Sequence, residues 1–253
     1  MQLLKDNWLV IWFFGIFFLE LIFYHKNYVK RIEAKEHWKT NLLNFIATKL
    51  ISIIFLISIV NLASKYSTHF LANLSPLISI VLSIFILDFA GYIFHRASHE
   101  IEFLWRFHEI HHLDEILDVS TSLRVHFLEA FFHTLVSCLV IYIFGIGQEA
   151  IAIHSLIAFV FATYHHSRFK LPINLEKILA LFVTTPSFHE PHHDEDIKNN
   201  QSNYAFIFPI WDRIFFTYNK RTFQSSWKFG LSYSKDVNAL NSLIKPLSKD
   251  GGK

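Results

Sequence analysis

Sulfur and charge are both scarce in this chain of 253 residues. It has one cysteine, Cys138, and one methionine, and 17% of its residues are charged, whereas a soluble domain carries about 25%. One cysteine excludes a disulfide scaffold, and a net charge of +2 excludes a strongly basic nucleic-acid binder. No long linker, internal repeat or low-complexity tract divides the sequence. We therefore expect a single domain over residues 1–253 and no nucleic-acid partner.

Hydrophobic side chains and histidine are abundant instead. Hydrophobic residues make up 52% of the chain, and its mean hydropathy is +0.32, which excludes a disordered chain. The 16 histidines are unexpected in such a composition, because polar groups in hydrocarbon are costly unless another group satisfies them. The positions of these histidines are therefore the main clue to function.

Apolar runs predict an all-α integral membrane protein with about four to five transmembrane or re-entrant helices. No small-residue cleavage site follows the first run, so we interpret it as a retained span rather than a secretory signal. Gly145 and Gly147 separate the last two runs, which favours a hairpin whose second leg is short enough to be re-entrant or tilted. The five runs are residues 8–24, 42–63, 77–94, 127–146 and 150–163.

The distribution of lysine and arginine predicts the orientation in the membrane. The loop at residues 25–40 carries five basic residues, whereas the loop at 64–76 carries one and the glycine turn carries none. Basic loops tend to stay in the cytoplasm, so the loop at 25–40 is expected there. Counting crossings from that loop places residues 95–126 and 165–253 on the same side. We predict that these two segments form a cytoplasmic helical cap.

Histidines recur in three clusters within this predicted cap. The first cluster is a pair four residues apart, and the other two are triplets with identical internal spacing. Residues four apart share one helical face, so a cluster can present several imidazoles to one ion. Solvated surface histidines explain this poorly, because no propensity makes histidine recur in such a pattern. The clusters are His95 and His99, then His108, His111 and His112, then His189, His192 and His193.

These clusters predict a site for two metal ions at the membrane surface. The first cluster begins where the third span ends, and two crossings separate the second cluster from the third. Eight imidazoles are too many for one ion, and neutral nitrogen ligands suit iron, zinc, copper or nickel. A structural zinc site usually includes cysteine, whereas an all-nitrogen pair with open positions suits iron and oxygen chemistry. We expect two irons, for which zinc can substitute in purified protein because it binds more tightly.

Two other functions fit parts of this pattern. Both triplets match H-E-x-x-H, a zinc-protease motif in which Glu109 would be the general base. Against a protease, the extra histidine has no role, Pro191 would strain a helix interior, and neither motif lies in a hydrophobic span. The other alternative is a non-catalytic metal-binding or metal-transport membrane protein. Transport predicts ionisable ligands within the spans, whereas the clusters lie just outside them.

These residues and their flanks resemble the fatty acid hydroxylase/sterol desaturase superfamily of membrane di-iron oxygenases. The similarity covers roughly residues 87–218. Three residues depart from the usual pattern, since Phe127 replaces a proline and Ala205 and Phe216 replace glycines. These departures affect backbone turns and the substrate wall rather than the ligands. The segments that carry the resemblance are Asp88–His99, Leu104–His112, Ser122–Glu129, His166–Ser167, Thr185–His193, Asn203–Tyr204 and Trp211–Phe215.

The resemblance implies a fold, a chemistry and one more ligand. It implies a cap over about four spans, two irons held by the eight motif histidines, and oxygen-dependent hydroxylation or desaturation of a fatty acyl, sterol or alkyl lipid. Members often add a histidine near the end of the hairpin helix, which is His166 here, with His165 as the competing choice.

Other polar residues of these motifs are candidates for positioning the ligands. Asp88 and Tyr92 share one helical face with the first histidine pair, and Asp88 is expected to accept the N–H of a ligand histidine. A further set is expected either to surround the ligands or to brace the cap. This set comprises Arg124, His126, His165, Asn203 and Asp212.

The remaining histidines are expected to lie outside the site. His133 and His154 fall in the hairpin, where a neighbouring helix usually satisfies such rings. His25, His37 and His69 lie in loops or at the interface with no cluster around them.

The sequence also predicts partners and a location. It has no flavin, haem or ferredoxin-like segment, so electrons for O2 chemistry on a lipid are expected from a separate carrier, either cytochrome b5-like or a ferredoxin with its reductase. The compact chain, with no retention tail at Gly251–Lys253, favours a bacterial inner membrane over the endoplasmic reticulum.

Overall fold

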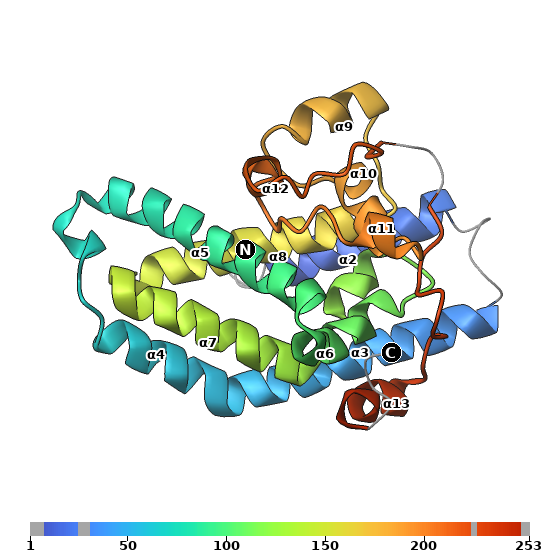
Figure 1. The fold of residues 1–253 in the computed structure, drawn as a ribbon, viewed down its shortest axis with the longest axis horizontal. Coiled ribbons are helices and arrows are strands. Elements are labelled where there is room, and N and C mark those ends of the chain that lie inside the picture. The colour runs from blue at the N-terminus through green and yellow to red at the C-terminus, as the bar shows by residue number, and fades with distance from the viewer. Residues whose placement is uncertain (1–7, 25–30, 224–226, 249–253) are drawn as a thin grey trace.

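The structure, a computed structural model, describes residues 8–24, 31–223 and 227–248, and the regular secondary structure in these ranges is helical. Apart from two isolated β-bridges, these ranges contain no strand. Long helices run side by side along the longest axis of the molecule, with the short helices α9 to α12 above them and α13 below them in this view (Figure 1). The expected all-α fold is confirmed.

The long helices form the body of the molecule. A π-helical turn, Ser52–Leu56, joins α3 to α4 without a break, and a 3-10 turn, Leu71–Asn73, precedes α5. The longer helices are α2 (Trp8–Tyr24), α3 (Arg31–Ile51), α4 (Ile57–Lys65), α5 (Pro76–Glu100), α6 (Glu102–His112), α7 (Phe127–Phe144) and α8 (Gln148–His166). The short elements of the cap are the 3-10 turns Val119–Leu123, Glu190–His193 and Lys245–Leu247 and the helices α9 (Ile173–Leu179), α10 (Pro186–His189), α11 (Ile197–Asn200), α12 (Ile210–Ile214) and α13 (Ala239–Ile244).

Three described helices are long and apolar enough to cross a membrane, namely Lys35–Lys65, Pro76–Glu100 and Phe127–Phe144. Helix α2 contains a shorter apolar stretch, and α8 is long enough but less apolar. These helices agree with a multi-pass membrane protein, while the boundaries of each span and its orientation stay predictions. Residues 25–30 of the basic loop, including His25, lie outside the described residues.

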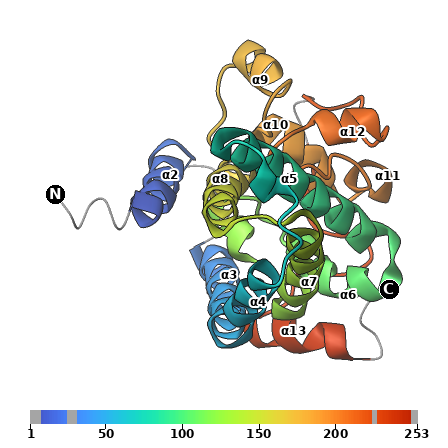
Figure 2. The ribbon, with the colours of Figure 1, turned by 90° about the vertical axis from the view of Figure 1, so that its left-hand side faces the viewer.

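Helices α7 and α8 form the hairpin that the two glycines predicted. Helix α7 ends at Gly145, whose φ of +69° is left-handed and therefore favours glycine. A Cβ atom at this position would lie 2.6 Å from the backbone N and Cα of His69, so only glycine fits. The turn is thus held against the loop before α5. Seen along the bundle, α5 packs against both α7 and α8, while α2 lies outside, next to α8 (Figure 2).

The cap is attached to the bundle by the carboxylate of Asp88 in α5. Asp88 accepts hydrogen bonds from the backbone N–H groups of Ile207 and Phe208, at 3.1 and 3.2 Å, and from the Trp211 indole N–H at 2.8 Å. Phe85, one turn earlier in α5, stacks on Phe208 with ring centroids 4.5 Å apart. A polar side chain in a candidate span therefore fastens the segment that leads into α12.

A buried ion-pair network closes the opposite side of the cap. The His37 ring lies between two carboxylates, with Nδ1 2.8 Å from Asp114 and Nε2 3.1 Å from Asp118. Ser120 and Asn41 add hydrogen bonds within this network. All of these side chains are buried, and they connect α3 to the loop that follows α6. His37 therefore lies outside the histidine clusters, as expected, but it is not a solvent-exposed bystander.

Candidate metal centre

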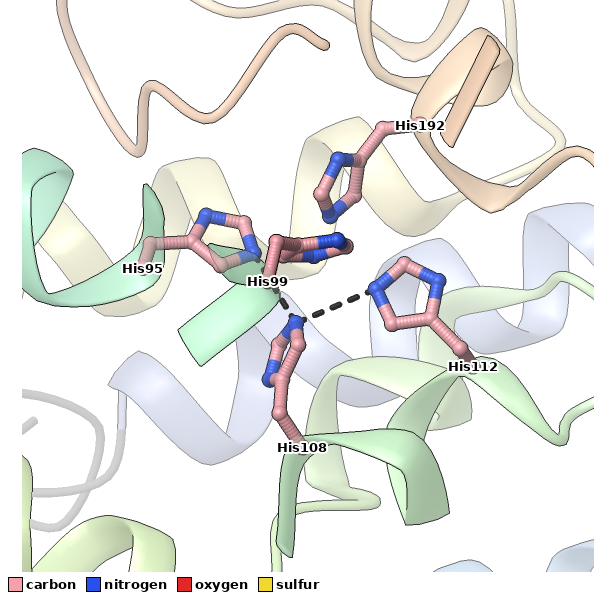
Figure 3. Close-up of side chains that lie close together, drawn as sticks. All are labelled: His95, His99, His108, His112 and His192. Carbon is pink, nitrogen blue, oxygen red and sulfur yellow. Dashed lines mark hydrogen bonds between the residues drawn. The ribbon is translucent and has the colours of Figure 1, made fainter. Parts of the chain in front are cut away.

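Five predicted ligands meet in one buried group, here called the five-histidine group. Helices α5 and α6 each contribute two histidines on one face, and the 3-10 turn after α10 contributes the fifth (Figure 3). Their ligand atoms lie within 4.8 Å of one another. The closest pairs are Nε2 of His108 with Nε2 of His95, at 3.1 Å, and with Nε2 of His112, at 3.0 Å. The group comprises His95, His99, His108, His112 and His192.

The other four predicted ligands form a second group, here called the four-histidine group. His166, at the end of α8, has its Nε2 atom 3.0 Å from Nε2 of His111 and 3.3 Å from Nε2 of His189. His193 completes the group, 3.1 Å from His189. All ligand atoms again lie within 4.8 Å of one another, and all four residues are buried. The structure thus brings together all nine histidines that the sequence singled out.

Each histidine triplet contributes to both groups. A helical residue is turned by about 100° from its neighbour, so His111 is turned by about 60° from His108 and about 100° from His112, and it reaches the four-histidine group. In the later triplet, His192 is the residue that crosses to the five-histidine group. Pro191 stands in the first turn of the 3-10 element, where a missing N–H costs nothing, so the strain considered for a helix interior does not arise.

Backbone carbonyls orient many of these rings. The Nδ1 atom of His95 lies 2.7 Å from the Tyr204 carbonyl, and that of His192 lies 2.8 Å from the Ser202 carbonyl. His166 and His111 make the same kind of contact with the carbonyls of Ala162 and Arg124, at 2.7 and 3.3 Å. A carbonyl can only accept, so the proton lies on Nδ1 and the lone pair of Nε2 is left for a metal.

The two groups fit metal ions by three tests. Two nitrogens bound to one ion at about 2.1 Å and at right angles lie about 3.0 Å apart, close to the Nε2 separations in both groups. The Nε2 atoms of His99 and His192 are buried in the five-histidine group (Figure 3), and neither has a hydrogen-bond partner among the described residues. Every donor is a neutral nitrogen, which suits iron or zinc and disfavours magnesium and calcium.

The protonation state of the rings favours metal binding. Burial, and then repulsion from neighbouring imidazoles, holds the pKa of His192 and His193 far below the ordinary value of 6.5. Burial likewise lowers the pKa of His166 to about 4. These rings are therefore neutral at pH 7, as a ligand must be.

His165 and His166 occupy different environments, although both are buried. His166 belongs to the four-histidine group, whereas His165 has its Nδ1 atom 3.1 Å from the Thr184 hydroxyl and belongs to neither group. The His165 ring does lie against His189, with centroids 4.1 Å apart. Of the two alternatives that the sequence left open, the geometry favours His166 as the ligand and His165 as a neighbour that packs on it.

The carboxylate that contacts a ligand histidine is Glu129, not Asp88. Glu129, in the first turn of α7, has its Oε1 atom 2.7 Å from Nδ1 of His108. Asp88 was expected in this role, but its oxygens accept backbone and indole N–H groups instead. Tyr92 likewise bonds Thr217, at 2.9 Å, rather than a histidine. The signal for Glu129 was its place three residues after His126, at the start of a predicted helix.

Arg124 and His126 act on the site through the backbone. The Arg124 side chain is buried and donates to the Ile110 carbonyl at 2.8 Å and to Asp236, while its own carbonyl faces His111. His126 begins α7, where its Nδ1 atom accepts the N–H of Leu128 at 3.2 Å. Both residues therefore fix the segment between α6 and α7.

Asn203 and Asp212 brace the later half of the site. Asp212 accepts the Tyr204 N–H at 2.8 Å, and the Tyr204 carbonyl in turn faces His95. Burial raises the pKa of Asp212 to about 6, although hydrogen bonds, with that from Thr217 the largest, oppose the shift. Asn203 donates to the Phe188 carbonyl at 2.6 Å, next to His189. Each residue thus positions a histidine indirectly: Asp212 acts on His95 through Tyr204, and Asn203 acts on His189 through Phe188.

Phe216 is the departure with the clearest structural consequence. It stands where the resemblance leads one to expect glycine, and its φ of +58° lies in the left-handed region that glycine adopts without strain. Its side chain is 93% exposed, so packing does not offset the strain within the described residues. The structure therefore keeps the backbone turn of the motif with a residue poorly suited to it.

Neither glutamate of the H-E-x-x-H motifs is available as a protease base. Glu109 is paired with Lys245 at 2.5 Å, and Glu190 is paired with Lys170 at 2.5 Å. Neither belongs to a histidine group. Both carboxylates are held by lysines, as expected for residues that stabilise the cap.

Comparisons with known proteins agree with this site. Residues 80–217 match the family described as fatty acid hydroxylase. Ornithine lipid hydroxylase OlsE of Rhizobium tropici is 29% identical over 196 residues, covering 76% of this chain and 57% of that protein. Alkylglycerol monooxygenase is 33% identical over 132 residues in Homo sapiens and 32% over 131 in Xenopus tropicalis, in each case 52% of this chain and 28% of the relative. The chain thus covers little more than half of the first relative and about a quarter of the others. No solved structure matches it.

Proposed function

Because the chain belongs to the fatty acid hydroxylase family, we propose that it is a membrane-bound di-iron oxygenase that hydroxylates or desaturates a lipid. The observation that carries the proposal is the pair of buried histidine groups at the end of candidate span α5. The substrate is a fatty acyl, sterol or alkyl lipid, and relatives named for ornithine lipid and alkylglycerol support this class. O2 is the oxidant, and a cytochrome b5-like protein or a ferredoxin with its reductase supplies electrons.

In this proposal the nine histidines hold two ions, one in each group. Bound iron would supply oxygen activation and attack on a C–H bond, for which side chains alone are unsuited. The chain's own residues fix the ligands: carbonyls orient several rings, and Glu129 orients His108. The Tyr204 ring packs against the five-histidine group, with its centroid 5.0 Å from that of His99 and 5.6 Å from that of His192.

We place the metal centre on the cytoplasmic side, in a bacterial inner membrane. The five basic residues within positions 25–40 support this orientation, although the structure places Arg31, Lys35 and Lys39 in the first part of α3 rather than in a loop. The proposal brings a membrane lipid and a cytoplasmic electron carrier to one site from opposite directions.

Iron content measured together with oxygen consumption tests the proposed function. Protein reconstituted anaerobically with ferrous iron should bind two irons and consume O2 when a lipid and a reductant are added. Comparing the lipids of cells with and without the gene should show one class gaining a hydroxyl group or a double bond. Protein that binds two irons but consumes no O2 with any lipid would contradict the oxygenase and leave a metal-binding role.

A further inference from the structure

A cavity of about 220 Å³ lies between α5, α7 and α8. This volume equals several waters, and the cavity is open on one side rather than sealed in the interior, so a bound molecule can enter it. Its walls include Leu87 and Gly91 from α5 and Phe159 and Ala162 from α8. The helices α5 and α7 that border it are both candidate membrane spans. The cavity therefore suits a hydrocarbon chain.

The cavity ends next to both histidine groups. Phe206 forms part of its wall, and the Phe206 ring lies 5.1 Å from the ring of His95 and 6.2 Å from that of His133. Ala162, another wall residue, provides the carbonyl that orients His166. From Ala162 the cavity follows α8 back to His154, eight residues or about 12 Å along the helix. A chain that fills it would thus begin beside the metal centre and extend away from it.

Two imidazoles interrupt this apolar wall. The Nε2 atom of His154 is buried and has no hydrogen-bond partner among the described residues. His133, which also lines the cavity, packs on the rings of Phe94 and Phe206. The expectation that a neighbouring helix satisfies both rings is therefore wrong for His154. A buried polar atom without a partner costs free energy, and a bound molecule can remove that cost.

We propose that this cavity binds the hydrocarbon chain of the lipid and that His133 and His154 bind a neutral oxygen group, a hydroxyl or a carbonyl, carried by that chain. The inference rests on the proposed function, because the lipid in the cavity is taken to be the substrate of the adjacent metal centre. It adds that the preferred lipid carries an oxygen group on its hydrocarbon chain. The attacked carbon lies between this oxygen group and the headgroup.

The chemistry of the walls selects a neutral oxygen group. A neutral imidazole offers one N–H donor and one lone pair, so two of them can both donate to and accept from a hydroxyl. The lining contains no lysine or arginine, so an anionic group would be unpaired. Asp88 also borders the cavity, but its two oxygens already accept three N–H groups from the cap.

Binding of matched fatty acids tests the inference without turnover. The full chain, loaded with zinc and kept in detergent, is titrated with stearic acid and with hydroxystearic acids that differ in the position of the hydroxyl. We expect the hydroxystearic acid whose hydroxyl reaches the two rings to bind about fivefold more tightly than stearic acid. Isomers with the hydroxyl at other positions should show no gain in affinity. A flat series in the wild-type protein would overturn the inference.

Variants locate the effect. His154→Phe should abolish the preference while changing stearic acid affinity by less than about twofold, whereas His154→Gln, which keeps a hydrogen-bonding group, should retain part of it. Tyr142→Phe removes a hydroxyl from the exposed face of α7 and is the matched control, with no expected effect. A preference unchanged in both His154→Phe and His133→Phe would place the oxygen elsewhere and overturn the inference.

The result is separable from that for the proposed function. A position-dependent preference in protein that never consumes O2 would refute the oxygenase and keep the binding site. Oxygen consumption together with a flat binding series would refute only the binding site. If His154→Phe does not fold, the series in the wild-type protein still decides.

Discussion

The metal centre and the network around His37 both contain buried imidazoles, but the second nitrogen of the ring faces different groups. In the candidate metal centre, His192 has a carbonyl at Nδ1, and its other nitrogen lies among the imidazoles of the five-histidine group. His37 has a carboxylate at each nitrogen, Asp114 at one and Asp118 at the other. The first ring keeps a lone pair for an ion, whereas the second holds two protons and is a cation. Burial alone therefore does not identify a ligand histidine; its second nitrogen does.

Removing one ligand from each histidine group is expected to have the largest effect. We expect His111→Ala and His192→Ala each to lower metal content, measured by mass spectrometry, and to reduce activity by more than about 100-fold. The reason is that losing even an outer partner of a ligand costs about 10–100-fold. His165→Ala, which removes a buried ring outside both groups, should keep the metal. Unchanged metal content in both ligand variants would remove these residues from the ligand set.

His37→Ala is expected to act on stability instead. It leaves the carboxylates of Asp114 and Asp118 buried without their cation, which costs about 3–5 kcal/mol of unfolding free energy. The folded fraction should retain its metal. Glu36→Ala breaks an exposed pair with Lys39 and should cost less than about 1 kcal/mol, as measured by denaturant unfolding in detergent. If His37→Ala lost metal at unchanged stability, the distinction between the two regions would fail.

Glu129→Gln tests the carboxylate that contacts a histidine of the five-histidine group, as Asp114 and Asp118 contact His37 in the other region. It keeps the size of the side chain but removes the charge beside His108, so metal affinity should fall by about 10–100-fold. Competition with a chelator measures this. Glu149→Gln, an exposed glutamate in the first turn of α8, is the matched control and should leave affinity unchanged. Equal affinities for both variants would show that Glu129 does not support its ligand.

The pH dependence of Asp118 is the smallest expected effect. Burial raises the pKa of Asp118, but the charge of His37 and hydrogen bonds from Ser120 and Trp38 outweigh it, so the pKa lies below 3.8. A group whose pKa is lowered by folding stabilises the protein above its unfolded pKa, and that stability is lost as the pH falls below it. Unfolding free energy should therefore fall below about pH 4 by up to about 1.4 kcal/mol per unit, and less steeply in Asp118→Asn. Parallel slopes would contradict this.

Local spacing made the metal centre predictable. The pairs four residues apart in α5 and α6 share a helical face wherever those helices lie, so the grouping of His95 with His99 and of His108 with His112 could be predicted from sequence alone. The hairpin was predictable for the same reason, because Gly145 and Gly147 act within one turn. The counting of crossings then brought the early and late clusters to one side.

Long-range contacts were not predictable from spacing. Nothing near His37 in the sequence indicates Asp114 and Asp118, which reach it from more than 70 residues away, so it was assigned no cluster. Asp88 was placed on the correct helical face but bonds the cap rather than a ligand, because the donors of Ile207 and Trp211 come from a distant segment. The assignment of each triplet to both groups likewise depends on tertiary packing.

The sharing of ligands between the two groups has a consequence for synthesis of the protein. Before α7 and α8 have been synthesised, the five-histidine group lacks His192 and the four-histidine group has only His111. A nascent chain that ends before α10 therefore holds an incomplete set in both places. A metal ion that uses either complete group can therefore be bound only late in biogenesis, after α7, α8 and α10 have been made, and two separately made halves of the protein would have to meet before either group was complete.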